Sequence, residues 1–216
     1  LLSHDLRTFT GNSQSLAQLI LAENTNETVK EYASLIAQST SQQLHFIESF
    51  LKLLKAQDEL LNSNHELQTI SFSDIHAKVN EQVQQQLTLK HIRLNSVIEK
   101  KKKALLINPE LLVRVLVNMV DNAIKFSFPE SEIQVKYFIK NDQMQIAVTD
   151  NGVGFNVGQS EILFQKFTSQ KKKGTANEAS TGLGLYLCKT IVERYKGSLQ
   201  ATSEGENKGA TFTVCF

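Results

Sequence analysis

Two asparagines, Asn118 and Asn122, stand four residues apart in a segment whose apolar residues recur at helical spacing. Residues four apart share one face of a helix, so we expect the two side-chain amides to point the same way. Neutral amide oxygens suit a Mg²⁺ ion whose charge is balanced mainly by the phosphates of a substrate. Lys125 would add a positive charge to those phosphates. One asparagine taken alone is better explained as a helix cap or a solvent-facing residue.

Two glycine-containing segments have the composition of ligand-binding turns. Asp150 follows an expected strand and precedes Gly152 and Gly154, which permit a turn and a close approach of the backbone to a ligand. The carboxylate there can accept a hydrogen bond from an exocyclic amine such as that of adenine. Gly182 and Gly184 open an expected helix, whose first N–H groups and dipole favour an anion. Each segment alone is weak evidence, because such turns are common in proteins.

Between these two segments lies Phe164-Gln165-Lys166-Phe167, followed by a polar stretch at 168–180 that contains three consecutive lysines. This composition fits a mobile lid over bound phosphates. A solvated surface loop would have the same composition, so the stretch does not decide between the two interpretations.

Taken together and in this order, the segments resemble the histidine kinase branch of the ATPase superfamily that includes gyrase, heat-shock chaperone and mismatch-repair ATPases. The resemblance covers residues 70–216. It implies an α/β sandwich that binds ATP between helices and a lid. It also makes Phe164 and Phe167 the aromatic pair that anchors the lid.

On the phosphate side of the expected site, the resemblance assigns a role to each matching residue. Asn122 would be the principal Mg²⁺ ligand, Asn118 a supporting polar contact and Lys125 a phosphate contact. Gly182-Leu183-Gly184 would line the phosphates of the bound ATP. The implied cofactors are therefore ATP and Mg²⁺.

On the adenine side, the resemblance makes Asp150 the residue that reads the base, and Gly152 and Gly154 would shape the pocket around it. Gly209-Ala210-Thr211 resembles the closing strand motif of the family. The resemblance implies that Thr211 supports Asp150 through a water molecule.

Near the start of the chain, Ser3-His4-Asp5-Leu6-Arg7-Thr8 resembles the phosphoacceptor motif of the commonest histidine kinase class. A neutral imidazole nitrogen is a good nucleophile near pH 7. The resemblance makes Asp5 the carboxylate that orients the ring, as in the serine triad. It makes Thr8 the residue that positions a water for removing phosphate from the partner protein. Arg7 either stabilises developing phosphate charge or pairs with an acidic neighbour.

Two positions depart from the family pattern. Phe9 stands where a proline is common after the threonine, so the first helix is expected to lack the usual kink. Asn108 stands where an aspartate is common before the long helix. We interpret that position as a helix cap, where asparagine serves equally well.

The first 65 residues contain no proline and a single glycine, and they predict a helical hairpin that turns at Glu23–Asn26. Two such helices cannot bury two broad apolar stripes alone, so a second copy is expected to complete a dimeric four-helix bundle. The second stripe comprises Val29, Ala33, Ile36, Thr40, Gln43, Ile47, Phe50 and Leu54. Its polar members, Thr40 and Gln43, either fix the register of the bundle or mark a locally unstable point in it.

Helices and antiparallel strands are expected to share one domain after residue 66. The predicted fold class is therefore α+β, with a hairpin domain at 1–65 and an α/β sandwich ATP-binding domain at 66–216. The expected helices lie at 72–89, 109–126 and 182–195, and the expected strands lie at 92–98, 104–107, 133–139, 144–149 and 211–216.

The composition is that of an ordinary globular protein, with 41% apolar and 21% charged residues and a net charge of +1. The charge balance excludes a strong polyanion binder, so no nucleic-acid role is expected. Two cysteines are too few for a disulfide framework and indicate a reducing, cytoplasmic compartment. No apolar run is long enough to span a bilayer. Because the sequence starts at Leu1 inside a helical pattern, we interpret it as a fragment, whose parent protein carries any membrane anchor elsewhere.

The predicted function is that of a sensor histidine kinase of two-component signalling. It would phosphorylate its own His4 from ATP, and pass the phosphoryl group to an aspartate of a response-regulator receiver domain, with phosphatase activity as a further expectation. One alternative is a degenerate kinase that acts as a nucleotide-gated dimeric scaffold. Another is a gyrase-type clamp, but those enzymes hydrolyse ATP with a glutamate where this chain has Asn118.

Overall fold

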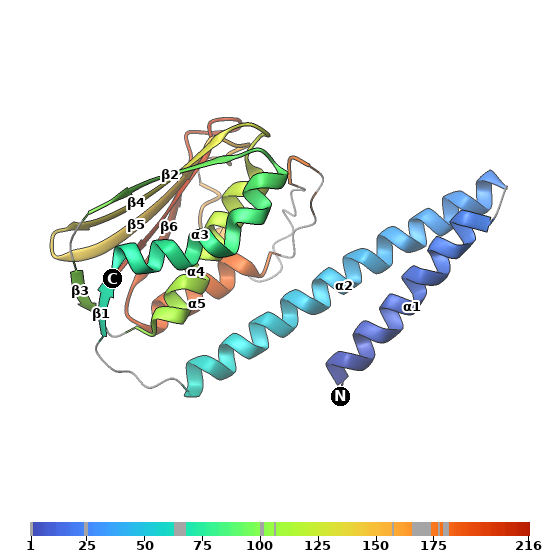
Figure 1. Cartoon of the computed structure of the whole chain (residues 1–216), viewed down its shortest axis with the longest axis horizontal. Coiled ribbons are helices and arrows are strands. Elements are labelled where there is room, and N and C mark those ends of the chain that lie inside the picture. Colours follow the sequence, from blue (N-terminus) through green and yellow to red (C-terminus); the bar gives the residue numbers. More distant parts are fainter. Residues whose placement is uncertain are drawn as a thin grey trace. The chain divides into compact units, whose positions relative to one another are not determined.

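The computed structural model of the chain describes residues 2–23, 26–62, 68–99, 102–105, 107–156, 158–165, 174–176, 178 and 182–216. These residues form two compact units, Leu1–Asp58 and Glu59–Phe216 (Figure 1). In the described ranges, no helix combines the length and the apolar character needed to cross a membrane.

The first unit is a helical hairpin, formed by α1 (Leu2–Glu23) and most of α2 (Glu27–Asn62). Asn26 caps α2, because its Oδ1 accepts hydrogen bonds from the N–H groups of Thr28 at 3.0 Å and Val29 at 3.3 Å. The turn predicted at Glu23–Asn26 is therefore confirmed at its last residue, whereas Asn24 and Thr25 lie outside the described residues.

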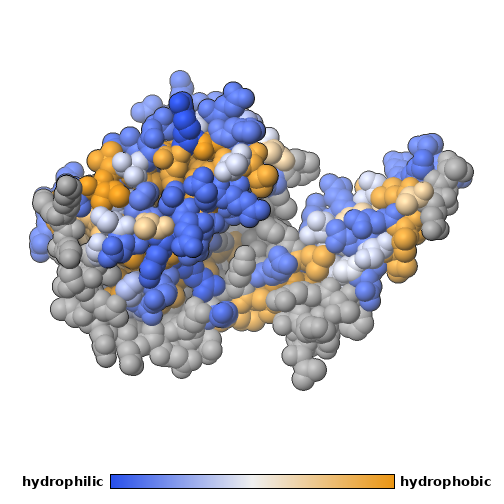
Figure 2. Space-filling model, viewed as in Figure 1, coloured by the Kyte–Doolittle hydropathy of each residue, from blue (hydrophilic) through white to orange (hydrophobic). Residues whose placement is uncertain are grey.

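The hairpin buries small side chains and leaves large apolar ones at its surface. Ala17 and Ala33 are each 1% exposed. Thr40 is also buried, and its hydroxyl donates within its own helix to the carbonyl of Ile36 at 2.8 Å. The exposed large apolar side chains are Leu16, Leu19, Ile20, Tyr32, Leu35, Ile36, Phe46, Phe50 and Leu54. Figure 2 shows orange, hydrophobic areas on the surface of the hairpin. A single hairpin thus leaves much of the predicted stripe uncovered.

The second unit is built on a five-stranded sheet in the order β2-β4-β5-β7-β6, in which only β2 and β4 run parallel. A separate two-stranded sheet pairs β1 with β3. The strands are β1 (Gln68–Ser71), β2 (Arg93–Ile98), β3 (Lys102–Leu105), β4 (Glu132–Lys140), β5 (Gln143–Asp150), β6 (Ser198–Thr202) and β7 (Ala210–Cys215). Neither β1 nor β6 was predicted, and β3 begins two residues before the strand expected at 104–107.

Three helices cover one face of the large sheet, namely α3 (Phe72–Leu89), α4 (Pro109–Phe126) and α5 (Gly184–Arg194) (Figure 1). Local sequence determines where two of them begin. The Oγ of Ser71 accepts from the N–H of Asp74 at 3.4 Å, and Oδ1 of Asn108 accepts from the N–H of Glu110 at 2.8 Å. The prediction that Asn108 serves as a cap is therefore confirmed.

The core lies between the sheet and these helices. Alternate residues of a strand point to one face of the sheet, and those of β4, β5 and β7 meet the apolar sides of α3, α4 and α5. Completely or almost completely buried members include Ile133, Val135, Met144, Ile146, Val148, Val214, Val79, Val83, Leu112, Leu116, Met119 and Ile191. This arrangement confirms the predicted α+β class.

A tight turn joins β4 to β5. Its two central residues, Asn141 and Asp142, both have a left-handed backbone, with φ of 52° and 57°. Two consecutive left-handed residues are typical of the type I′ turn, which matches the twist of paired strands. The predicted hairpin is therefore confirmed, and its register pairs Lys140 with Gln143.

Candidate functional site

Helix α4 carries a polar stripe on the side that faces away from the core. Asn118, Asn122 and Lys125 are half-buried along this stripe, whereas the neighbouring apolar residues of the helix are buried. Their spacing of four and three residues places the three side chains on one face. The two asparagines thus share one face of the helix, as the sequence predicts, and Lys125 lies on the same face.

The beginning of α5 lies against this stripe at Asn118. A Cβ atom added to Gly184 would be 3.7 Å from Oδ1 of Asn118. One turn further along α5, Cys188 is buried, with its Sγ 3.6 Å from the carbonyl of Val115. Burial raises the pKa of Cys188 to about 12, although a hydrogen bond with Asn118 opposes this shift. Cys188 is therefore a neutral packing residue at the joint of α4 and α5.

The N-terminus of α5 has the form of an anion-binding turn. Gly182 has a left-handed backbone with φ of 67°, and the capping residue Leu183 makes no side-chain hydrogen bond to the helix. The first N–H groups of a helix have no partner within the helix. In this position they favour a negatively charged ligand next to Asn118.

The turn after β5 is joined to the opposite end of α4. The N–H of Val153 donates to the carbonyl of Phe126 at 3.1 Å, and Ser127 forms an isolated bridge with Gly152. These contacts place Asp150 and its glycines beside the last turn of the helix that carries Asn122 and Lys125.

Asp150 is the most perturbed carboxylate of this region. It is 3% exposed, and its Oδ1 accepts hydrogen bonds from the N–H groups of Gly152 at 2.9 Å and Ala210 at 3.2 Å. Burial raises the pKa of Asp150 to about 6, although the two backbone hydrogen bonds act in the opposite direction. A buried carboxylate held in one orientation is suited to reading a hydrogen-bond donor of a ligand.

The two glycines after Asp150 are required by contacts within the protein. A Cβ atom on Gly152 would overlap the carbonyl group of Phe126. Gly154 has φ of 56°, and a Cβ atom there would lie 2.8 Å from Oγ of Ser203. Both glycines therefore allow the turn to pack closely against α4 and the β6–β7 connection.

Replacing Gly152 with alanine is expected to destabilise the second unit by about 1–3 kcal/mol, because the added methyl group must displace the end of α4. Urea unfolding followed by circular dichroism measures this change. Gly11→Ala is the matched control, since nothing lies within 4 Å of its added Cβ atom. An unchanged free energy of unfolding for Gly152→Ala would contradict the close approach described above.

The hydroxyl of Thr211 contacts the neighbouring strand β5. Oγ1 of Thr211 lies 3.0 Å from Oγ1 of Thr149, its partner in the β5–β7 ladder. Side chains alternate between the two faces of a strand, and it is the neighbouring Ala210 that pairs with Asp150. The strand therefore supports Asp150 directly through the backbone N–H of Ala210, a contact that sequence reasoning missed.

Phe164 belongs to a buried aromatic cluster. Its ring lies edge-on to that of Phe212, with 6.5 Å between the centroids, and the ring of Phe155 is tilted against Phe212, also with 6.5 Å between the centroids. The Nζ of Lys189 on α5 lies 5.7 Å from the centroid of Phe164. Phe164 thus anchors the short helix at Ile162–Phe164 to the sheet and α5, while Phe167 lies outside the described residues.

A loop segment, of which the structure describes Gly174–Ala176 and Glu178, lies at the end of α4, next to Lys125. The N–H of Thr175 donates to the carbonyl of Lys125 at 3.1 Å, and a Cβ atom on Gly174 would be 2.8 Å from Cγ of Lys125. Burial lowers the pKa of Lys125, Lys90 acts in the same direction, and Glu178 opposes it. The contacts of Lys90 and Glu178 at this point were not predicted from the sequence.

The expected phosphoacceptor residues lie in α1 of the other unit. The backbone of His4, Asp5 and Thr8 is helical, and helical spacing places His4 and Thr8 on one face. Their side chains lie outside the part of the chain that the structure describes.

The residues present fit a magnesium ion only if the ion arrives with a ligand that carries negative charge. Among the described residues, no three His, Cys, Asp or Glu side chains are gathered so that they could hold a metal. Asn122 supplies a neutral amide oxygen, which suits Mg²⁺ bound mainly through substrate phosphates and water.

The chain belongs to the histidine kinase-, DNA gyrase B-, and HSP90-like ATPase family, whose sequence profile matches residues 107–216. It is 26% identical over 178 residues to the signal transduction histidine-protein kinase ArlS of Staphylococcus haemolyticus (strain JCSC1435), covering 79% of this chain and 39% of that protein. It is 27% identical over 220 residues to the hybrid signal transduction histidine kinase L of Dictyostelium discoideum, covering 99% of this chain and 13% of that protein. The chain therefore spans well under half the length of these curated relatives.

Two solved structures share the fold over almost the whole chain. Full-length ShkA in complex with AMPPNP has a TM-score of 0.67 at 18% sequence identity, and covers 99% of this chain and 44% of ShkA. The histidine kinase AdeS of Acinetobacter baumannii has a TM-score of 0.64 at 19% identity, and covers 99% of this chain and 96% of AdeS. At these identities the likeness shows the fold, and it confirms a helical hairpin followed by an ATP-binding-type sandwich.

Proposed function

We propose that this chain is the catalytic core of a protein-histidine kinase. It uses magnesium ATP to phosphorylate its own His4 and transfers the phosphoryl group to an aspartate of a response-regulator receiver domain. One observation carries the proposal: three separate segments contact the one helix α4. The Asp150 turn and the segment Gly174–Ala176 contact its last turn, and the glycine-opened start of α5 lies against Asn118. The family match and the AMPPNP bound to the similar protein ShkA support the same ligand.

On the adenine side, Asp150 would accept a hydrogen bond from the exocyclic amine of the base. Its Oδ1 already holds two backbone N–H groups, so Oδ2 is the acceptor proposed for the amine. The carboxylate distinguishes adenine from guanine, because guanine presents a carbonyl oxygen at the corresponding position of its ring.

On the phosphate side, the N–H groups at Gly182–Gly184 and the start of α5 would hold the negatively charged oxygens. Lys125 would contribute a positive charge, and Asn122 would bind the magnesium ion with Asn118 beside it. When bound, the ion neutralises phosphate charge and helps to align the terminal phosphate with the nucleophile. The chain itself would contribute mainly positioning and charge stabilisation.

At the hairpin, a neutral ring nitrogen of His4 would attack the terminal phosphorus of ATP, forming a P–N bond as the bond to ADP breaks. Asp5 would stabilise the ring as it becomes positively charged. Thr8 would position water for the reverse task, removal of phosphate from the receiver. These reactions would take place in the cytoplasm, where ATP and receiver domains occur together.

The hairpin is also proposed as a homodimer interface. Its exposed Leu, Ile, Phe and Tyr side chains line both α1 and α2, and such patches mark association surfaces. A second copy would cover them in a four-helix bundle.

The proposed function is tested by incubating the chain with magnesium and ATP labelled in its terminal phosphate, then adding receiver domains of the source organism. We expect a label on the chain that resists base, is lost in acid and moves to a receiver. Nucleotide binding without any labelled protein would contradict catalysis and would favour the nucleotide-gated scaffold, the alternative that the Phe9 substitution suggests.

A further inference from the structure

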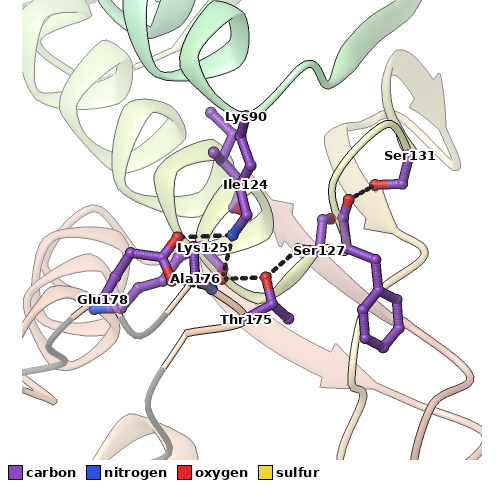
Figure 3. Close-up of polar contacts among 9 residues, drawn as sticks. Lys90, Ile124, Lys125, Ser127, Ser131, Thr175, Ala176 and Glu178 are labelled. Carbon is purple, nitrogen blue, oxygen red and sulfur yellow. Dashed lines mark hydrogen bonds and ion pairs between the residues drawn. The ribbon is translucent and has the colours of Figure 1, made fainter.

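Lys90, at the end of α3, is a buried cation outside every motif discussed above. It is 8% exposed, and its ammonium group donates three hydrogen bonds (Figure 3). They run to the carbonyl of Ile124 at 2.8 Å, the carbonyl of Lys125 at 2.8 Å and Oε1 of Glu178 at 2.7 Å. One side chain thus joins α3, the end of α4 and the loop at 174–178.

On the helix side, Lys90 donates hydrogen bonds to backbone carbonyl groups at the end of α4. The last carbonyls of a helix have no partner in the helix, and a cation near them is favoured by the helix dipole. The backbone of Lys90 is fixed as well, because its N–H donates to Gln86 at 3.2 Å and its carbonyl accepts from Glu130 at 3.3 Å. Lys90 therefore provides a rigid attachment point.

On the loop side, Glu178 accepts hydrogen bonds from two backbone N–H groups of the same segment. Its Oε2 accepts from the N–H of Ala176 at 2.8 Å, and its backbone carbonyl accepts from the N–H of Gly174 at 3.0 Å. Burial alone would raise the pKa of Glu178, but the hydrogen bonds from Lys90 and Ala176 outweigh burial and lower it. The carboxylate is therefore ionised at neutral pH and forms a charged pair with Lys90.

The attachment lies next to residues of the proposed site. Lys90 binds the carbonyl of Lys125 itself, and Gly174 packs against the side chain of Lys125. Thr175 adds hydrogen bonds from its N–H to Lys125 and from its hydroxyl to the carbonyl of Ser127 (Figure 3). Loss of the Lys90–Glu178 pair would therefore free the loop beside the expected phosphate contact.

We propose that Lys90 and Glu178 are positioning residues for the nucleotide: their ion pair holds Gly174–Ala176 and Glu178 on the end of α4 and thereby slows nucleotide release. This inference rests on the proposed function, since it concerns retention of the same ligand. Neither residue needs to touch the nucleotide, because both act through the placement of Lys125 and the segment beside it.

The test uses the chain 1–216 with Lys90→Met, Glu178→Gln and both changes together. The dissociation rate of a fluorescent ATP analogue, trinitrophenyl-ATP, is measured by displacement with excess ATP. We expect each single change to raise this rate about tenfold, which corresponds to about 1.4 kcal/mol. The double variant should release the analogue no faster than the faster of the two single variants, because each of the three variants lacks the same ion pair.

Hydrogen exchange of the segment 174–178 without nucleotide is the second readout, and it should increase in all three variants. Glu27→Gln is the control, because it removes an exposed pair with Lys30 (3.4 Å) in the hairpin and should change neither measurement. Circular dichroism and thermal unfolding establish that each variant is folded.

Folded variants that release the analogue at the wild-type rate would overturn this inference alone, as would unchanged exchange of the segment. A wild-type chain that binds no analogue would overturn the proposed function, and with it the role of the pair in nucleotide retention. In that case, increased hydrogen exchange in the variants would show that the ion pair holds the segment in place but has no role in nucleotide binding.

Discussion

Replacing Asp150 with asparagine is expected to reduce affinity for ATP by at least about a hundredfold, because a charged hydrogen bond and its geometry are lost together. The N–H groups of Gly152 and Ala210 need an acceptor on the inner side of the side chain. The amide oxygen must therefore face inward, which leaves the NH₂ group toward the base. The NH₂ group of the asparagine and the exocyclic amine of adenine, both hydrogen-bond donors, would then face one another. Isothermal titration calorimetry with ATP measures the loss.

The same substitution is expected to stabilise the protein without nucleotide. Because burial raises the pKa of Asp150 from 3.8 to about 6, ionisation in the folded state costs about 3 kcal/mol at most above pH 6. Asparagine carries no charge and keeps the inner acceptor. We therefore expect the free energy of unfolding in urea to increase by about 1–3 kcal/mol at pH 7.5.

The stability gain should depend on pH in a defined direction. Above pH 6 Asp150 is ionised in both the folded and the unfolded state, so the full cost is present. As pH falls from 6 to 3.8 the folded state takes up the proton first, and the cost disappears. The difference between wild type and Asp150→Asn should thus shrink toward pH 4. Asp142→Asn, in the exposed β4–β5 turn, is the control; an equal gain there, or a gain that persists at pH 4, would contradict the assignment.

Replacing His4 with glutamine is expected to abolish labelling of the chain by ATP labelled in its terminal phosphate. Glutamine has a similar reach but no ring nitrogen that can attack phosphorus. Binding of ATP should remain within about twofold of wild type, since the residues proposed to bind the nucleotide belong to the other unit. Autoradiography and calorimetry on the same preparation separate the two effects.

His45→Gln, in α2 of the same hairpin, provides the matched control for the loss of a histidine. It should keep wild-type labelling. Persistent labelling of the His4 variant would show that the phosphoryl group resides on another residue, and would remove the basis for the roles proposed for Asp5 and Thr8.

The parts of the site that follow from local spacing could be predicted from the sequence. Asn118, Asn122 and Lys125 share a face because they lie within one helix, and the start of that helix is encoded by Asn108 and the proline after it. The β4–β5 hairpin was equally predictable, because alternating apolar residues flank an Asn-Asp turn. In these cases the residues that make the feature are neighbours along the chain.

Features created by distant segments escaped prediction. Lys90 stands in a segment with no sign of burial, and its partners lie 34, 35 and 88 residues away. The strands β1 and β6 have only four and five residues, too few for a clear alternation. The support of Asp150 by the backbone N–H of Ala210 carries no side-chain signature, because any residue but proline has that N–H group.

The order of strands in the large sheet has a consequence for how the molecule matures. Strand β7, made from some of the last residues of this domain to be synthesised, occupies an interior place between β5 and β6. It also delivers the N–H of Ala210 to Asp150. A nascent chain that ends before residue 210 therefore lacks β7 in the sheet. It also lacks the N–H group of Ala210 that holds the carboxylate of Asp150 in place. The proposed adenine site can therefore form only when translation of this domain is complete.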